Sequence, residues 1–150
     1  MGTSFTRTLE LIERLHRQCL EVVKAELDRL AVRDLTSVQA VILFNIGRDE
    51  FSIGDLTQRG YYLGSNVSYN IKKMIKHGYL LQARSTQDRR LLLVRASPAG
   101  VEIHLALDSL FEAHASNELI RNQVSEDCLN RSNEALRNLH GIWASQSRAR

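Results

Sequence analysis

The part of this 150-residue chain that is most informative about its architecture is residues 63–100, LGSNVSYNIKKMIKHGYLLQARSTQDRRLLLVRASPAG. In the first half, apolar residues recur at steps of three and four: Val67, Ile71, Met74 and Ile75. This spacing predicts an amphipathic helix over residues 64–77 that ends at Gly78. The second half holds two short apolar runs, residues 79–85 and 90–96, around a polar tip, which predicts a β-hairpin. We therefore expect a helix followed directly by a hairpin.

Helical patterns precede this segment. Residues 9–30 repeat apolar side chains with the period of a long amphipathic helix. Residues 36–47 begin with Thr36 and Gln39, the pattern of a capping box, and continue as an almost wholly apolar run, so we expect a buried second helix. Residues 52–59 begin with a similar Ser-x-x-Asp cap, which predicts a short third helix.

Two further helices are predicted after the hairpin. Ser97 and Pro98 supply an N-cap and a first-turn proline for a helix that we expect to continue to about Ile120, and Ser125 caps the start of the last one. The last helix has an apolar side: Leu129, Leu136, Leu139, Ile142 and Trp143. The predicted fold class is mainly α with a small β-hairpin wing. The order of helix, short helix, turn, helix and hairpin is that of a winged helix-turn-helix.

Basic residues are concentrated in residues 56–95. The segment holds eight of them against the single acid Asp88, a local charge of +7 in a chain of net charge +3, so the rest of the chain sums to −4. The eight are Arg59, Lys72, Lys73, Lys76, Arg84, Arg89, Arg90 and Arg95. Such asymmetry is typical of proteins that bind a polyanion, although a solvated basic face gives the same count.

The helix over residues 64–77 is the predicted reader of DNA bases. The side away from its apolar stripe presents polar and cationic groups and no carboxylate: Ser65, Asn66, Ser68, Tyr69, Lys72, Lys73 and Lys76. We expect the short polar groups to meet base edges in the major groove and the lysines to meet phosphates. At the hairpin tip we expect Arg89 and Arg90 to enter the adjacent minor groove, while Asp88 holds a neighbouring arginine.

Residues 63–100 resemble the core of the MarR family of winged helix-turn-helix transcriptional regulators, in the reader helix, the exit at Gly78–Leu80 and the Asp-Arg-Arg wing. The sequence GYYLGSNVSYN, residues 60–70, is also similar to that of LdtR-type regulators. The resemblance implies a homodimer with Arg90 in the minor groove, paired with Asp88. Tyr69 stands at a position where many members carry a basic residue, so the resemblance does not indicate which bases this helix recognises.

The resemblance also gives a domain plan. Residues 1–150 form one MarR-type domain, with a DNA-binding lobe over about residues 34–97 and dimerisation helices over about residues 5–31 and 98–147. A two-fold reader of a pseudo-palindromic operator needs such helices to hold two lobes one helical turn apart. We expect a cytoplasmic protein, because no apolar run of membrane-spanning length occurs.

The family resemblance further implies repression and control by a small effector, for which His16, Phe44, Tyr61 and Tyr62 are candidate pocket residues. Aromatic residues in such places are more often core. Two alternatives stay open at this stage. Cys19 and Cys128 are candidates for oxidant sensing, although a buried cysteine usually serves as a small apolar filler. The second alternative is a winged-helix protein–protein module that does not bind DNA.

Enzymatic and metal functions have no candidate residues. The five histidines never fall at ligand spacing with each other or with a Cys or Glu partner, so we expect no metal site. No nucleophile elbow, phosphate-binding glycine loop or dinucleotide fingerprint occurs, and no cofactor is expected.

Overall fold

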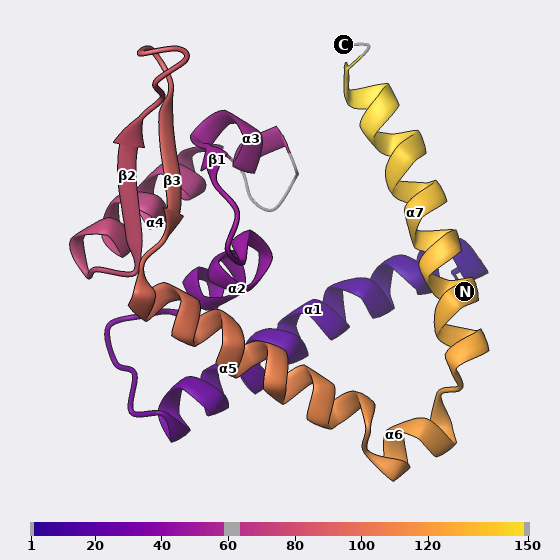
Figure 1. Ribbon diagram of the computed structural model, residues 1–150. Helices are drawn as coiled ribbons and strands as arrows, with labels where there is room; N and C mark the ends of the chain where they lie inside the picture. Colours follow the sequence, from indigo (N-terminus) through magenta and orange to yellow (C-terminus); the bar gives the residue numbers. More distant parts are fainter. Residues whose placement is uncertain (1, 59–63, 149–150) are drawn as a thin grey trace. The chain divides into compact units, whose positions relative to one another are not determined.

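The computed structural model describes residues 2–58 and 64–148, and the chain divides into two compact units, residues 1–110 and 111–150. The first unit contains the following elements: α1 (Ser4–Arg29), α2 (Ser37–Ile46), β1 (Phe51–Ser52), α3 (Ile53–Gln58), α4 (Gly64–Lys76), β2 (Leu80–Arg84), β3 (Leu92–Ala96) and most of α5 (Pro98–Ala115). The second unit contains the end of α5, α6 (Glu118–Gln123) and α7 (Glu126–Arg148) (Figure 1). The predicted fold class, mainly α with a small wing, is confirmed.

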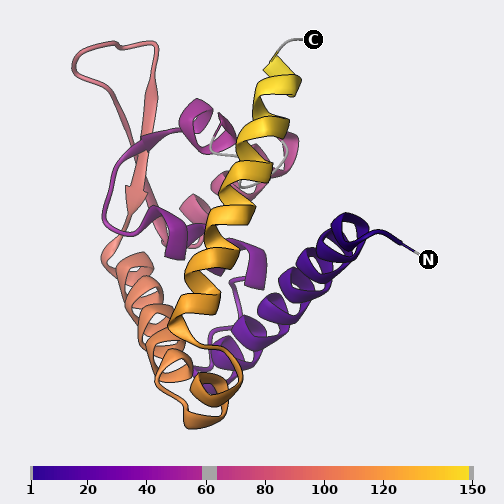
Figure 2. The same ribbon diagram turned by 90° about the vertical axis from the view of Figure 1, so that its right-hand side faces the viewer.

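The sheet is antiparallel, and β3 is its central strand, with β1 on one side and β2 on the other. The hairpin pairs Leu80 with Ala96 at its base and Arg84 with Leu92 towards its tip. In Figure 2 the loop that joins β2 to β3 stands clear of the helices of the first unit. The predicted hairpin is present, and a short third strand that the sequence did not indicate joins it, because Phe51 pairs with Val94.

The core of the first unit lies between α2, α4, the sheet and α5. Leu43 of α2, Met74 of α4, Val94 of β3 and Leu107 of α5 are each at most 1% exposed. Each such side chain contributes roughly 1.5–3 kcal/mol through the area it removes from water. α2 is apolar all round and is buried, as its sequence predicts, so it serves as the central support for α4 and the hairpin.

Local caps fix where the helices begin. Thr36 and Gln39 form both halves of the capping box of α2, and Ser52 and Asp55 exchange hydrogen bonds of 3.0 and 3.1 Å at the start of α3. Ser97 accepts from the backbone N–H of Gly100 at 3.2 Å and caps α5. These three predicted helix starts are confirmed.

The C-terminal helices differ from expectation at one point. The fifth helix ends at Ala115 and does not continue to about Ile120. Asn117 then caps α6 by accepting the backbone N–H of Leu119 at 2.9 Å. An asparagine side chain competes well with helical backbone bonds, which explains the break. Neither α6 nor α7 buries a residue.

Candidate nucleic-acid interface

α4 has one buried face and one exposed face. Val67, Ile71 and Met74 are at most 2% exposed and hold the helix against the core. On the other side Asn66, Tyr69, Lys72 and Lys76 are exposed, while Ser68 and Lys73 are half-buried. The side chain of Ser65 lies outside the described residues. The described polar and cationic side chains predicted to read DNA therefore share one surface that carries no carboxylate.

A buried glutamine links α4 to the start of α2. The side-chain oxygen of Gln39 accepts from the backbone N–H of Thr36 at 3.1 Å, and its Nε2 donates to Oδ1 of Asn70 at 3.1 Å. Gln39 is 5% exposed, so both bonds lie in a partly desolvated place where an unmet polar group is costly. The same side chain thus caps α2, as its sequence predicts, and also fixes the rotation of α4 through Asn70, a link that no sequence pattern signalled.

The end of α4 is held by Asp34 of the connection between α1 and α2. Nδ1 of His77 donates to the carbonyl oxygen of Asp34 at 2.9 Å, and the Tyr79 hydroxyl donates to the Asp34 carboxylate at 2.6 Å. Burial, the bond to Asp34 and the charge of Asp34 raise the pKa of Tyr79 to about 12. The phenol therefore keeps its proton at neutral pH and stays a donor.

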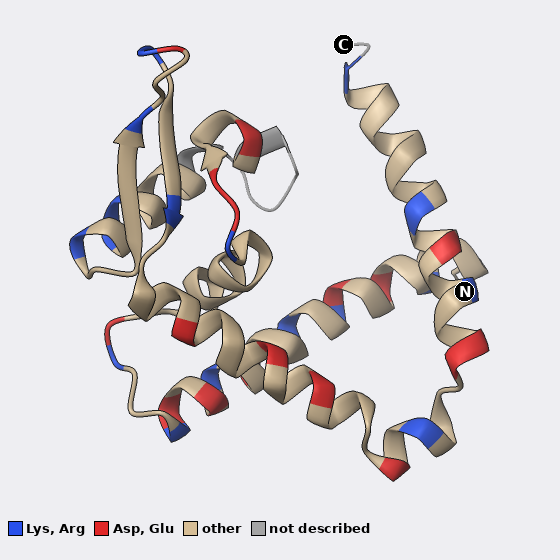
Figure 3. Cartoon of the chain, in the orientation of Figure 1, with Lys and Arg blue, Asp and Glu red and all other residues tan. Residues whose placement is uncertain are grey.

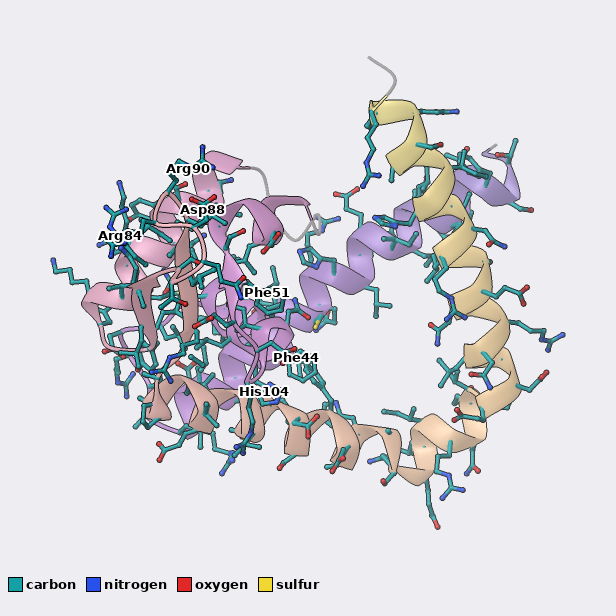
Figure 4. The ribbon with its side chains drawn as sticks, turned by 45° about the horizontal axis from the view of Figure 1, so that its top comes forward. Phe44, Phe51, Arg84, Asp88, Arg90 and His104 are labelled. Atoms are coloured by element: carbon teal, nitrogen blue, oxygen red, sulfur yellow. The ribbon has the colours of Figure 1, made fainter. Side chains whose placement is uncertain are left out.

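The hairpin tip is organised by Asp88 and Arg90 (Figure 4). The Asp88 carboxylate accepts three hydrogen bonds from Arg90, from its backbone N–H and Nε at 3.1 Å and from a terminal nitrogen at 3.2 Å. Bonds from the side chain and then the backbone of Arg90 hold the pKa of Asp88 below its ordinary value, although desolvation raises it. The Arg90 side chain remains 90% exposed, so the pair aims the guanidinium outward and leaves it open to a ligand.

Two more residues shape this tip. Arg84, at the end of β2, donates to the carbonyl oxygen of Arg89 at 2.8 Å. The Ser85 hydroxyl accepts from the backbone N–H groups of Gln87 and Asp88, both at 3.2 Å. These bonds fix the loop backbone that leads into Arg90, which lowers the ordering cost of a contact made there. The sequence marked Arg84 as a charge, but nothing in it indicated this positioning role.

The described charges have a clear distribution (Figure 3). Among the described residues, α4 and the hairpin carry seven Lys and Arg residues against the single acid Asp88, whereas α5 carries acidic residues without Lys or Arg and α1 carries both signs. Seven of the eight basic residues of residues 56–95 therefore lie on one contiguous set of elements, α4 and the hairpin. This arrangement suits a polyanion with a regular backbone.

Of the predicted pocket residues, the described Phe44 and His16 do not join this surface. Phe44 lies against His104 of α5, with ring centroids 5.7 Å apart, and its carbonyl oxygen accepts from Nδ1 of His104 at 3.0 Å (Figure 4). His16 is exposed on α1. Tyr61 and Tyr62 lie outside the described residues. Their predicted role in an effector pocket stays a prediction.

The two cysteines lie in different helices of the described part, and their role in oxidant sensing stays a prediction. Cys19 is half-buried in α1 and Cys128 is exposed in α7, both as free thiols. Within residues 2–58 and 64–148, His, Cys, Asp and Glu side chains form no group of three that could hold a metal ion. No helix of that described part is long and apolar enough to cross a membrane.

Comparison with known proteins assigns this surface to a class. Residues 35–100 match a family model described as a winged helix DNA-binding domain. The exopolysaccharide II synthesis transcriptional activator ExpG of Rhizobium meliloti (strain 1021) is 30% identical over 138 residues, which cover 92% of this chain and 71% of ExpG.

Solved structures share the fold. AbsC, a MarR family transcriptional regulator from Streptomyces coelicolor, matches with a TM-score of 0.72 and 17% identity over 97% of this chain and 98% of its own. Streptococcus pneumoniae FabT, solved in complex with DNA, matches with a TM-score of 0.68 and 20% identity over 95% of this chain and 99% of its own.

The fold, the basic α4 and hairpin surface and the matching domain model define a winged-helix DNA-binding protein. The chain belongs to the MarR family of transcriptional regulators, and it is a DNA-binding regulator and not an enzyme. The family resemblance of residues 63–100 is thereby confirmed, while the finer likeness to LdtR-type regulators stays a prediction.

Proposed function

We propose that this regulator binds a pseudo-palindromic operator as a homodimer, with α4 in the major groove and the hairpin tip in the minor groove. The observation that carries the proposal is the exposed face of α4. It presents Tyr69, Lys72 and Lys76 without a carboxylate, beside a hairpin whose Arg90 is held outward by Asp88. Polar groups at the start of α4 and arginine at the wing tip suit the two grooves in these roles.

The exposed apolar side of α7 supports the proposal of a homodimer. This helix has 23 residues and buries none of them, yet one of its sides carries apolar residues: Leu129, Leu136, Leu139, Ile142 and Trp143. Leu136 is 39% and Ile142 is 55% exposed. Further exposed apolar residues lie on α1, including Leu15 at 71%. Such faces are typical of an interface with a second copy of the chain.

Sedimentation equilibrium tests this dimer. Leu136→Glu on the apolar side of α7 is expected to give a monomer that keeps its helical content and loses most of its operator affinity. Asn130→Glu, about 120° away around the helix at 100° per residue, is the matched control and should remain dimeric. A Leu136→Glu protein that is still a dimer at micromolar concentration would contradict the proposal.

We propose that the regulator represses transcription. Repression results when the operator overlaps a promoter, because the bound regulator then blocks that promoter. A second candidate, activation, is favoured by the name of ExpG, a transcriptional activator. In vitro transcription from the chain's own promoter region and from promoters near selected binding sites separates the two. Repression predicts fewer transcripts as the regulator is added, and activation predicts more.

We also propose that a small effector controls the binding of this regulator to DNA. An effector that releases DNA must bind two conformations of the dimer with different affinities. Phe44 is the half-buried member of the predicted pocket set, so Phe44→Ala should change the response to an effector and leave basal operator affinity within about twofold, a factor worth under half a kcal/mol.

The alternatives are tested in the same assays. Oxidant sensing through Cys19 and Cys128 predicts that mild peroxide changes operator affinity and that Cys19→Ser removes the change; unchanged binding after peroxide ends that hypothesis. A protein–protein module predicts no salt-sensitive binding to any duplex, whereas the proposed regulator binds DNA with an affinity that falls steeply as salt rises.

A further inference from the structure

A cavity of about 290 Å³ lies beside α4, between that helix and the connection from α1 to α2. Arg33, Asp34 and Thr36 line one side of it, and Tyr69 and Lys73 of α4, with His77 just after the helix, line the other. All of these residues belong to the first unit. The cavity therefore brings a second segment of the chain to the edge of the surface that is proposed to read DNA.

The wall opposite α4 is fixed in place by Asp34. Its carbonyl oxygen accepts from Nδ1 of His77 at 2.9 Å, and its carboxylate accepts from the Tyr79 hydroxyl at 2.6 Å. These two bonds hold the preceding residue, Arg33, near the end of α4. The bond from Tyr79 also occupies one oxygen of the Asp34 carboxylate, which keeps its single negative charge.

The two cations of the cavity are available to a ligand. Neither Arg33 nor Lys73 forms an ion pair within the described part of the chain. Nζ of Lys73 lies 5.8 Å from the centroid of the Tyr69 ring, which keeps the ammonium on the cavity side of the helix. Two cations against one carboxylate favour an anionic ligand.

Tyr69 and Lys73 belong both to this cavity and to the outer surface of α4. Successive positions 69, 73 and 77 lie along one flank of the helix. When a helix lies in the major groove, its flanks face the sugar–phosphate strands that border the groove. The connection between α1 and α2 carries the basic Arg33 next to the acidic Asp34, and Figure 3 shows charge of both signs there.

We propose that this cavity seats a phosphate of the DNA backbone, bound by Arg33 and Lys73. Arg33 then extends the DNA contact beyond the helix-turn-helix and hairpin to the connection between α1 and α2. The inference rests on the proposed placement of α4 in the major groove. Its consequence is a contact that adds affinity for any duplex and positions α4, but does not choose sequence.

Salt titration of DNA binding tests this contact on an operator obtained by selection and on an unrelated duplex. Loss of one phosphate contact per protomer makes the slope of log K against log salt shallower by about 1.8 for a dimer. Arg33→Ala should show this change and a similar fold loss on both duplexes, while Arg33→Lys should keep most of the slope. Arg48→Ala is the matched control, because Arg48 lies beyond the other end of α2, about 15 Å along that ten-residue helix, and should leave the slope unchanged.

Phosphate ethylation interference locates the contact directly. Wild-type protein should show one interfering phosphate per half-site that is lost in Arg33→Ala. An unchanged slope and an unchanged interference pattern in Arg33→Ala overturn the assignment. Binding of inorganic phosphate at Arg33 in the free protein, seen by NMR together with an unchanged DNA slope, means a free-anion site and also overturns it. If Arg90→Ala still weakens binding in these cases, the proposed function survives and only the phosphate seat fails.

Discussion

Replacing Arg90 with alanine removes the guanidinium at the hairpin tip and leaves the rest of the fold intact. The side chain is 90% exposed and its described polar partner is Asp88 alone, so the free energy of unfolding should hardly change. A specific arginine contact in a DNA groove is worth roughly 1–3 kcal/mol. A homodimer carries two wings, so the loss of operator affinity should be roughly 2–6 kcal/mol if the two contacts are additive.

Fluorescence polarisation with a labelled operator at constant salt measures this loss. Arg84→Ala should give a smaller loss, because it loosens the loop around Arg90 but keeps the guanidinium. Arg95, exposed on β3 away from the tip, provides the matched control as Arg95→Ala. Operator affinity within about twofold of wild type for Arg90→Ala, under half a kcal/mol, would refute the role of the wing. Unfolding of that variant would refute the hairpin placement itself.

Three further predictions concern stability. Gly100→Ala should destabilise the first unit by roughly 1–3 kcal/mol in urea unfolding, because its Cβ would overlap the carbonyl oxygen of Tyr79; a fold as stable as wild type would be incompatible with this packing. Gly141→Ala should stabilise α7 by roughly 0.5–1 kcal/mol, since nothing lies within 4 Å of the added Cβ, and a lower melting temperature would argue against the helix there. Hydrogen bonds from Arg29, opposed by desolvation, lower the pKa of Glu26, so the pair stabilises the fold above the ordinary glutamate pKa and the effect is lost as pH falls through the lowered value. Glu26→Gln should therefore flatten the acid limb of stability against pH, and an unchanged limb would contradict the pairing.

Features set by local chemistry could be predicted from the sequence. Thr36 with Gln39, Ser52 with Asp55 and Ser97 mark helix starts because each side chain bonds backbone within three residues of itself. The two short apolar runs around a polar tip were likewise enough to predict β2 and β3. These signals placed α4 beside the hairpin, and with it most of the candidate interface.

Features set by distant contacts could not be predicted. β1 has two residues, too few for an alternating pattern, and it exists through its pairing with β3. Gln39 and Asn70 are 31 residues apart, and Asp34 and Tyr79 are 45 apart, so no spacing rule connects them. The end of α5 at Ala115 was missed because the apolar period continues past it. Arg33 was not predicted as a site residue, because only the packing of two distant segments brings it beside α4.

Selection of bound duplexes from a random pool tests the central claim most directly, that a dimer reads DNA through α4 and the hairpin tip. The account predicts enrichment of an inverted repeat whose half-site centres lie about one helical turn, 10–10.5 base pairs, apart, with A·T-rich flanks where Arg90 meets the minor groove. Absence of any enriched sequence, or enrichment of a single asymmetric half-site, would contradict it.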